Sequence, residues 1–287
     1  GATPTNTTRR NILRTKDEND WHSGQLIHLL ASMAALFHDL GKAMEVFQLR
    51  LVGKLEGRNR YRHEWVSLRL LEAFVGDDDD ESWLARLHSP TASDDECWLG
   101  QLKCDGLDGV REELSPFIHL PPIAKAIGWL IVSHHRLPAQ PALDEQSGKQ
   151  KWLGAKAPIN AGNLPALPND ITAAWNERVE PATRDEIAPY WTFPHGLPVT
   201  TKAWRERAQR LSRQLSAVRF TTPPLDSPYV MHLARMALML ADHHYSSLTD
   251  DGRLSGKWSL PLYANTANIN GKRQLSQPLE DHLLGVT

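Results

Sequence analysis

The chain has 287 residues, of which 41% are hydrophobic, and 34 acidic residues against 32 basic ones give a formal net charge of −2. This balance provides no overall attraction to nucleic acid, so a nucleic-acid partner would need a local basic patch. No run approaches the ~20 apolar residues needed to cross a bilayer, and no secretory signal is evident, so we expect no membrane partner. The two cysteines, Cys97 and Cys104, do not make a disulfide framework, so we expect a cytoplasmic protein.

Helical periodicity dominates the sequence and strand-like alternation is rare, so the predicted class is mainly α. Residues 1–20 are polar and charged and predict a lead-in or linker before one domain over residues 21–287. A loop-rich insertion is expected around residues 138–198, where the chain is rich in Pro, Gly and Ala. The chain begins with Gly-Ala instead of Met, which indicates a tag remnant or a domain taken from a longer protein.

An apolar stripe at helical spacing leads from Leu26 to Phe37 directly into the string HDLGKA. That string places His38 and Asp39 at the end of a buried helix, with Gly41 as a helix stop. An imidazole beside a carboxylate is a natural pair of metal ligands, and the carboxylate can bridge two ions. The alternative is a polar helix end with a capping aspartate.

A basic segment follows over residues 50–62, with five Lys or Arg residues against a single glutamate. It predicts either a solvated loop or a cationic surface for a phosphate backbone, and in the second case Arg58, Arg60 and Arg62 would contact nucleic acid. His63 then opens a helix on an apolar face, where it is either a satisfied core residue or a metal ligand.

A later helix starts at Pro121-Pro122 and carries a buried apolar stripe that ends at His134 and His135. Paired histidines at the end of a buried helix are costly unless they are hydrogen-bonded or bound to metal, so both are candidate ligands. Inside the insertion, Lys151 and Trp152 would suit stacking and backbone contact with single-stranded nucleic acid, or belong to a plain loop.

The last long helix, over residues 229–244, is apolar almost all round and should be central. Asp242 near its end is a candidate ligand, the alternative being an exposed C-terminal turn. Residues 249–278 predict a loop, because Asn, Gly and Ser recur throughout. Residues 279–286 predict a short helix that aims His282 inward, the alternative being a frayed terminus.

The candidate ligands therefore follow the order His38, Asp39, His63, His134, His135 and Asp242, each at one end of a predicted helix, so they could converge on one pocket for two ions. The strings NTTRRNIL, LFHDLGKA, RHEWVSLRLL and ADHHYSSL resemble the HD superfamily of metal-dependent phosphohydrolases. They are most similar to the HD nuclease domain of the CRISPR-associated nuclease-helicase of type I systems, in its type I-F branch. The resemblance implies an HD-superfamily helical bundle around a one- or two-metal site.

The resemblance further implies a metal-dependent nuclease that cleaves phosphodiester bonds of single-stranded DNA in CRISPR interference. Its partners would be the DNA strand, the surveillance complex that exposes it, a helicase domain in the parent protein and, as an antagonist, a phage inhibitor. The six candidate ligands would hold two divalent transition metal ions, and their imidazoles favour Mn, Fe, Co, Ni or Zn over Mg. Asp39 would be catalytic as the bridge between the ions, and Lys42 would bind the scissile phosphate or support a ligand.

One departure from the family pattern concerns a histidine that usually lies on a helix well upstream of the HD pair. Here only His22 and His28 precede the pair closely, and neither has the usual context. The string LEDHLLGV looks like the missing helix placed after Asp242, which implies a permuted domain with His282 as a further metal ligand. Two other functions stay open: an HD phosphohydrolase acting on nucleotides, and a non-catalytic interaction module that holds a structural metal.

Overall fold

Helices form most of the architecture, which confirms the mainly α class. The computed structural model describes residues 23–89, 98–109, 114–137, 141–143, 150–152, 167–176, 181–220, 222–269 and 271–287. The predicted lead-in, His22 and Cys97 lie outside these ranges, as does much of the predicted insertion. Among the described residues, no helix combines the length and the apolarity that spanning a bilayer demands.

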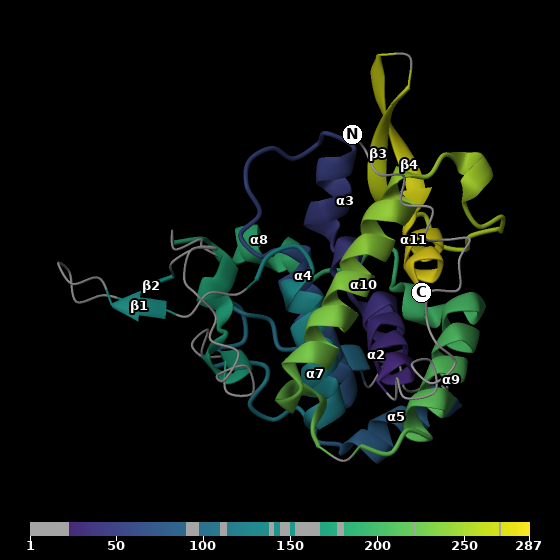
Figure 1. The fold of residues 1–287 in the computed structure, drawn as a ribbon. Helices are drawn as coiled ribbons and strands as arrows, with labels where there is room; N and C mark the ends of the chain where they lie inside the picture. Colours follow the sequence, from purple (N-terminus) through teal and green to yellow (C-terminus); the bar gives the residue numbers. More distant parts are fainter. Residues whose placement is uncertain are drawn as a thin grey trace, which may run out of the picture.

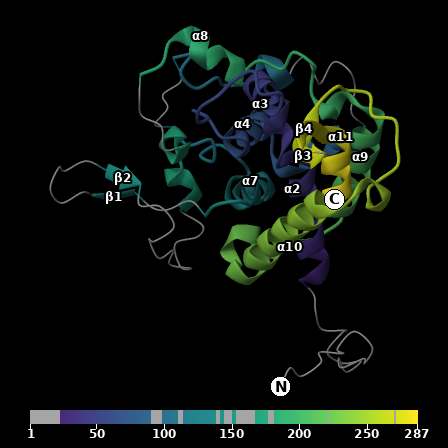
Figure 2. The same ribbon diagram turned by 90° about the horizontal axis from the view of Figure 1, so that it is seen from above.

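A bundle of helices surrounds one central helix. The bundle consists of α2 (Gly24–Phe37), α4 (His63–Val75), α5 (Asp80–His88), α7 (Pro122–Ser133), α9 (Lys202–Ser216), α10 (Pro228–Ser247) and α11 (Leu279–Val286), with η2 (Leu40–Ala43) and α3 (Glu45–Leu51) between α2 and α4. The central helix is α2, because α7, α9, α10 and α11 all pack against it (Figure 1). Figure 2 shows the long α10 lying across one side of α2. The end of α2 therefore lies deep inside the bundle.

The carboxyl end of α2 is fixed by α9. The indole Nε1 of Trp204 donates a hydrogen bond to the carbonyl of Leu36 at 3.0 Å. The rings of Phe37 and Trp204 meet edge to face, with their centroids 5.5 Å apart. All three side chains are buried, so packing sets the position at which the helix ends.

The turn after α2 packs directly against the start of α4. The backbone N–H of Gly41 donates to the hydroxyl of Ser67 at 2.8 Å. A Cβ at Gly41 would collide with the carbonyl oxygen of His63 and would lie 3.0 Å from the backbone nitrogen of Ser67. Only glycine therefore allows this approach, which brings Asp39 next to His63.

Two antiparallel hairpins interrupt the helices: β1 (Pro141–Leu143) pairs with β2 (Gln150–Trp152), and β3 (Tyr263–Ile269) pairs with β4 (Lys272–Pro278). The second hairpin, yellow in Figure 1, shows that the loop predicted over residues 249–278 was wrong. Asn270-Gly271 is a strong hairpin signal in the sequence, and Gly271 adopts the positive φ of 77° that such a turn favours.

The β3–β4 hairpin connects α3 to α11. The side-chain amide of Gln48 donates to the carbonyl of Tyr263 at 2.9 Å and accepts from its N–H at 3.2 Å. Strand β4 runs directly into α11, which packs against α2 and α10. A Cβ at Gly285 would overlap the ring of Tyr245, so this glycine permits the close contact between α11 and α10.

The described part of the predicted insertion contributes to the core. It contains the short turns η4 (Leu167–Asp170), η5 (Ala173–Asn176), α8 (Arg184–Ile187), η6 (Ala188–Tyr190) and η7 (Pro198–Thr200). Trp175 of η5 is fully buried and stacks with Trp65 of α4, with ring centroids 6.4 Å apart. The hairpin β1–β2 belongs to the same region and carries Lys151 and Trp152. Part of this region is thus a layer packed on α4.

Candidate metal centre

The first two candidate ligands lie where α2 ends. His38 and Asp39 are both fully buried. Nδ1 of His38 donates to the carbonyl of Ala35 at 2.8 Å, which fixes the tautomer and leaves Nε2 as the atom that can bind metal. That Nε2 lies 3.3 Å from Oδ2 of Asp39. The predicted pair is therefore oriented as two ligands of one centre.

Helices α4 and α7 bring three histidines to Asp39. Nε2 of His63, the first residue of α4, lies 3.0 Å from Oδ1 of Asp39. His134 follows α7, and its Nδ1 donates to the carbonyl of Ile131 at 2.6 Å, so its Nε2 is also available. His135 comes next and reaches solvent, with its ring 5.4 Å from that of His63.

Helices α10 and α11 supply the remaining candidates, Asp242 and His282. Nε2 of His282 lies 2.8 Å from Oδ2 of Asp39 and 3.2 Å from Oδ1 of Asp242. Nε2 of His38 lies 4.0 Å from the same oxygen of Asp242. His282 is fully buried within an intact helix, so the alternative of a frayed terminus is not observed.

Only one of the two upstream histidines can be placed relative to the centre. His28 is exposed on α2, and His22 lies outside the described residues. The placement of His282 beside Asp39 supports the interpretation that α11 takes the role of an upstream helix.

Among the described residues, the candidate ligands form two groups that share Asp39. One group consists of Asp39, His63, His134 and His135, the other of His38, Asp39, Asp242 and His282, and within each group the ligand atoms lie within 4.8 Å of one another. The buried Nε2 atoms of His38, His63 and His134 make no hydrogen bond. Buried polar atoms without hydrogen bonds are costly, and imidazole with carboxylate is a donor set of transition metals. These residues therefore fit bound metal.

The electrostatics of the centre favour neutral His38 and His134 and a charged Asp39. Burial lowers the pKa of His38 and of His134 to about 4, and metal binding requires the neutral imidazole. Burial alone would raise the pKa of Asp39, but His38, Lys42 and His63 hold it well below its usual value. Nζ of Lys42 lies 2.7 Å from Oδ2 of Asp39. Lys42 thus contacts the candidate ligand that the two groups share.

Sequence reasoning missed Glu64, which is fully buried directly after His63. Oε2 of Glu64 lies 3.3 Å from Nδ1 of His63, and Arg62 donates to Oε1 through Nε at 3.1 Å and Nη2 at 2.6 Å. A carboxylate behind a ligand histidine fixes the ring orientation and raises its basicity. Burial opposes ionisation, yet His63 and Arg62 lower the pKa of Glu64 to about 2. The available signal was an acid adjacent to a candidate ligand at a helix start.

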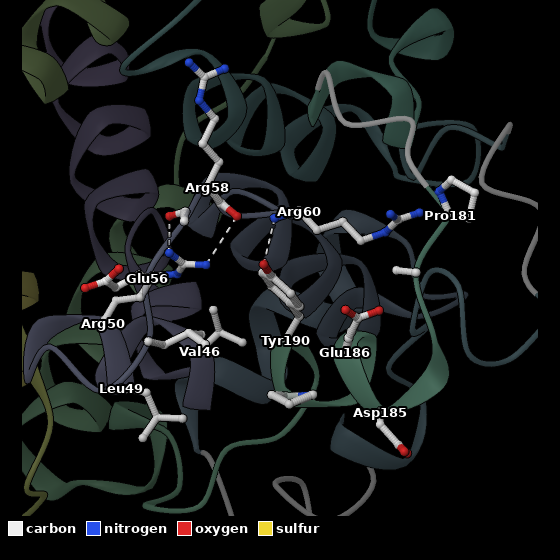
Figure 3. Close-up of a pocket in the computed structure, with 14 residues that line it drawn as sticks. Val46, Leu49, Arg50, Glu56, Arg58, Arg60, Pro181, Asp185, Glu186 and Tyr190 are labelled. Carbon is white, nitrogen blue, oxygen red and sulfur yellow. Dashed lines mark hydrogen bonds between the residues drawn. The ribbon is translucent and has the colours of Figure 1, made fainter.

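The predicted nucleic-acid contacts are spread over several places. Arg62 is paired with Glu64 beside the centre, whereas Lys151 and Trp152 belong to β2. Arg58 and Arg60 line a cavity of ≈ 390 Å³ beside α3 and α8 (Figure 3). That cavity also contains acidic residues, Glu56, Asp185 and Glu186, so its charge is mixed.

No protein-family model matches the chain. The CRISPR-associated nuclease/helicase Cas3 of subtype I-F/YPEST from Pseudomonas aeruginosa is 46% identical over 300 residues, a match that covers 100% of this chain and 25% of that protein. The protein of the same name from Pectobacterium atrosepticum is 41% identical over 297 residues, covering 100% of this chain and 26% of that protein. This chain corresponds to one segment of the subtype I-F CRISPR-associated nuclease/helicases. The resemblance predicted from the HD strings is confirmed, and the chain spans about a quarter of the length of these nuclease/helicases.

Proposed function

We propose that the chain is a metal-dependent nuclease that hydrolyses phosphodiester bonds of single-stranded DNA. The observation that carries this proposal is the pair of ligand groups that share Asp39. A carboxylate common to two groups of ligands is the arrangement expected of a two-metal phosphodiesterase, in which bound ions activate a water and stabilise the leaving oxygen. The names of the homologues, which include a nuclease and a helicase function, support the same reaction class.

The protein's own residues prepare the centre for this reaction. His38 and His134 are each anchored through Nδ1 to a carbonyl of their own helix, so both present Nε2 without further rearrangement. Lys42 keeps Asp39 ionised through a contact of 2.7 Å, and Glu64 orients His63 from behind. The histidine-rich donor set favours Mn, Fe, Co, Ni or Zn, and we propose two ions per chain.

In the cellular setting, we place this nuclease in CRISPR interference. The matching proteins are about four times as long as this chain, and their names include a helicase. A helicase domain of the parent protein would feed single-stranded DNA, exposed by a surveillance complex, to the metal centre. A phage inhibitor stays a predicted antagonist.

One experiment separates the three candidate functions. The protein, loaded with each transition metal in turn, is incubated with circular single-stranded DNA and, separately, with deoxynucleotides. A nuclease degrades the circle and leaves the nucleotides intact, a nucleotide phosphohydrolase does the reverse, and an interaction module does neither. The Asp39→Ala variant is the control for contaminating nucleases. Intact circles with every metal would refute the proposed function.

A further inference from the structure

The junction between β4 and α11 has a strained backbone. Among the residues that the structure describes, Gln277 is the one non-glycine residue with a positive φ, 59°. Gln277 also directly precedes Pro278, a position where steric contact with the proline ring favours extended backbone of negative φ. Such a conformation is unfavourable for a residue with a Cβ, and it persists only where the surrounding contacts hold it.

Contacts with three neighbouring elements hold Gln277 in this conformation. Gln277 is only 2% exposed. Its Oε1 accepts a hydrogen bond from Nδ2 of Asn265 on β3 at 2.6 Å, and its Nε2 donates to the carbonyl of Tyr245 on α10 at 3.5 Å. The chain just beyond it is also fixed, because the backbone N–H of Leu279 donates to the carbonyl of Leu262 at 2.9 Å. Gln277 thus joins the hairpin, α10 and the start of α11.

The direction in which α11 leaves this junction decides where His282 lies. Nε2 of His282 lies 3.2 Å from Oδ1 of Asp242, which is about one turn before Tyr245 on α10. Tyr245 contacts the junction and α11 at two points, through its carbonyl to Gln277 and through its hydroxyl to Oδ1 of Asp281 at 2.9 Å. The contacts of Gln277 therefore belong to the connection that sets the distance between His282 and Asp242.

We propose that Gln277 is a positioning residue for the metal centre, whose positive-φ backbone and two side-chain hydrogen bonds hold α11 where His282 reaches Asp39 and Asp242. The inference rests on the proposed function, because it assumes that the His38 group, which contains Asp242 and His282, binds an ion. Sparsely populated backbone conformations cluster where a fixed geometry is needed, and metal ligands must be held to within about 0.5 Å. Gln277 is not among the candidate ligands, so it acts through His282.

The test follows the binding of Co²⁺ to metal-free protein by visible absorption, which reports the ligands around the bound ion. His282→Ala removes a ligand of the His38 group alone, so the binding phase that it weakens identifies that group. Gln277→Ala keeps a Cβ but loses both hydrogen bonds, so it should weaken the same phase about tenfold and leave the phase of the group that contains His63 unchanged.

Gln277→Gly separates the role of the backbone from that of the side chain. It also loses both hydrogen bonds, but glycine adopts positive φ without strain, so it should bind the ion of the His38 group about fivefold more tightly than Gln277→Ala. A residue that only stabilises the fold would weaken both binding phases together. Gln277→Gly also provides the comparison with wild type if Gln277→Ala folds poorly, because loss of the hydrogen bonds should still weaken the His38 phase selectively.

Gln274→Ala is the matched control. Gln274 is a glutamine on the same strand, but it is exposed and does not have a positive φ. It pairs with Ala267 on β3, at a distance along the strand from α11. Its replacement should leave the affinity of both binding phases and the absorption spectrum at saturating Co²⁺ equal to those of wild type.

Equal affinities of Gln277→Ala and Gln274→Ala in both phases would overturn the proposal, as would equal weakening of the two phases in Gln277→Ala. Equal affinities of Gln277→Gly and Gln277→Ala would overturn the role of the backbone conformation. These measurements contain no DNA and are independent of the cleavage assay. If Gln277→Ala binds Co²⁺ like wild type while wild type degrades circular DNA, the positioning role fails and the nuclease function stands. If the His38 phase weakens selectively while circular DNA stays intact with every metal, the positioning role stands and the nuclease function fails.

Discussion

Nε2 of His282 lies 2.8 Å from Oδ2 of Asp39, so a helix near the end of the sequence reaches the same carboxylate as the HD pair. The other oxygen of Asp39, Oδ1, faces Nε2 of His63 at 3.0 Å. Because the two oxygens face different groups of ligands, Asp39 is the residue whose loss should affect both groups at once.

Asp39→Ala should abolish DNA cleavage and reduce bound metal to less than one ion per chain, measured by elemental analysis. The helical circular-dichroism signal should persist, because the surrounding helices are held by apolar packing. Asp251→Ala, at an exposed position, is the control and should keep metal and activity. Near-normal cleavage by Asp39→Ala would contradict the assignment of Asp39 as the shared ligand.

Replacing either His134 or His135 by alanine should lower the metal content by one ion, but the two replacements should differ in their effect on stability. His134 and His135 belong to the same ligand group, so either alanine variant should lose that group's ion and keep the ion of the His38 group. His134 is fully buried, and we expect His134→Ala to cost about 1–3 kcal/mol of unfolding free energy, against about 0.5 kcal/mol or less for the exposed His135. Full metal content in His135→Ala would make the site smaller than proposed.

Gly41→Ala should separate η2 from α4. The added Cβ meets the carbonyl of His63, so we expect a loss of about 1–3 kcal/mol of unfolding free energy and weaker metal binding. Gly100→Ala is the matched control, because a Cβ there meets nothing within 4 Å. Urea denaturation and metal titration measure the two effects. Equal stability of the two variants would show that the backbone around Gly41 and His63 can move apart without loss of unfolding free energy.

Gly285→Ala should reduce metal binding although Gly285 offers no ligand atom. Its Cβ would overlap the ring of Tyr245, so α11 must move away from α10 and carry His282 with it. We expect the ion of the His38 group to be lost and that of the His63 group to remain, giving about half the wild-type metal content. A Gly285→Ala variant with full metal content would show that α11 can shift without moving His282.

The metal-free protein should lose stability as the pH falls from about 6.5 to about 4. The pKa of His38 and of His134 drops from 6.5 to about 4 on burial, and partial burial next to His134 and His63 lowers that of His135 to about 4. In this window the unfolded chain binds more protons, so acid favours unfolding. His282 acts in the opposite direction, because its contacts with Asp242 and Asp39 outweigh burial and raise its pKa.

Urea midpoints measured between pH 4 and pH 7 test this balance of three lowered histidines against one raised histidine. His134→Gln should flatten the profile, whereas His28→Gln, at an exposed position, should leave it unchanged. A constant midpoint across the window would show that protonation of the buried histidines does not limit stability.

The sequence predicted which candidate ligands lie at the ends of buried helices and come together in the structure. Apolar periodicity located the ends of α2, α7 and α10. A polar side chain buried at such an end is costly unless it makes a hydrogen bond or binds a metal, so these positions were candidate ligands. His282 was predicted because the resemblance lacked one histidine and the last helix offered one. These signals depend only on residues close to one another in the chain, so they can be found in a single sequence.

Other parts of the centre could not be predicted, because they depend on contacts between distant segments. Arg136 meets Trp175 only because η5 folds back onto α4, and nothing local to either residue indicates that contact. The extent of the predicted insertion was likewise obscured by its Pro-rich composition, although Trp175 belongs to the core. The β3–β4 hairpin is different, because the sequence contains a recognised turn signal, Asn270-Gly271. The polar residues around that signal led to the prediction of a loop instead.

The position of His282 on α11 also determines when the centre is completed during synthesis. Every other candidate ligand precedes residue 243, so a nascent chain that ends before residue 279 can assemble the His63 group but lacks one ligand of the His38 group. A chain terminated before α11 would therefore hold the His63 group of candidate ligands without a complete His38 group.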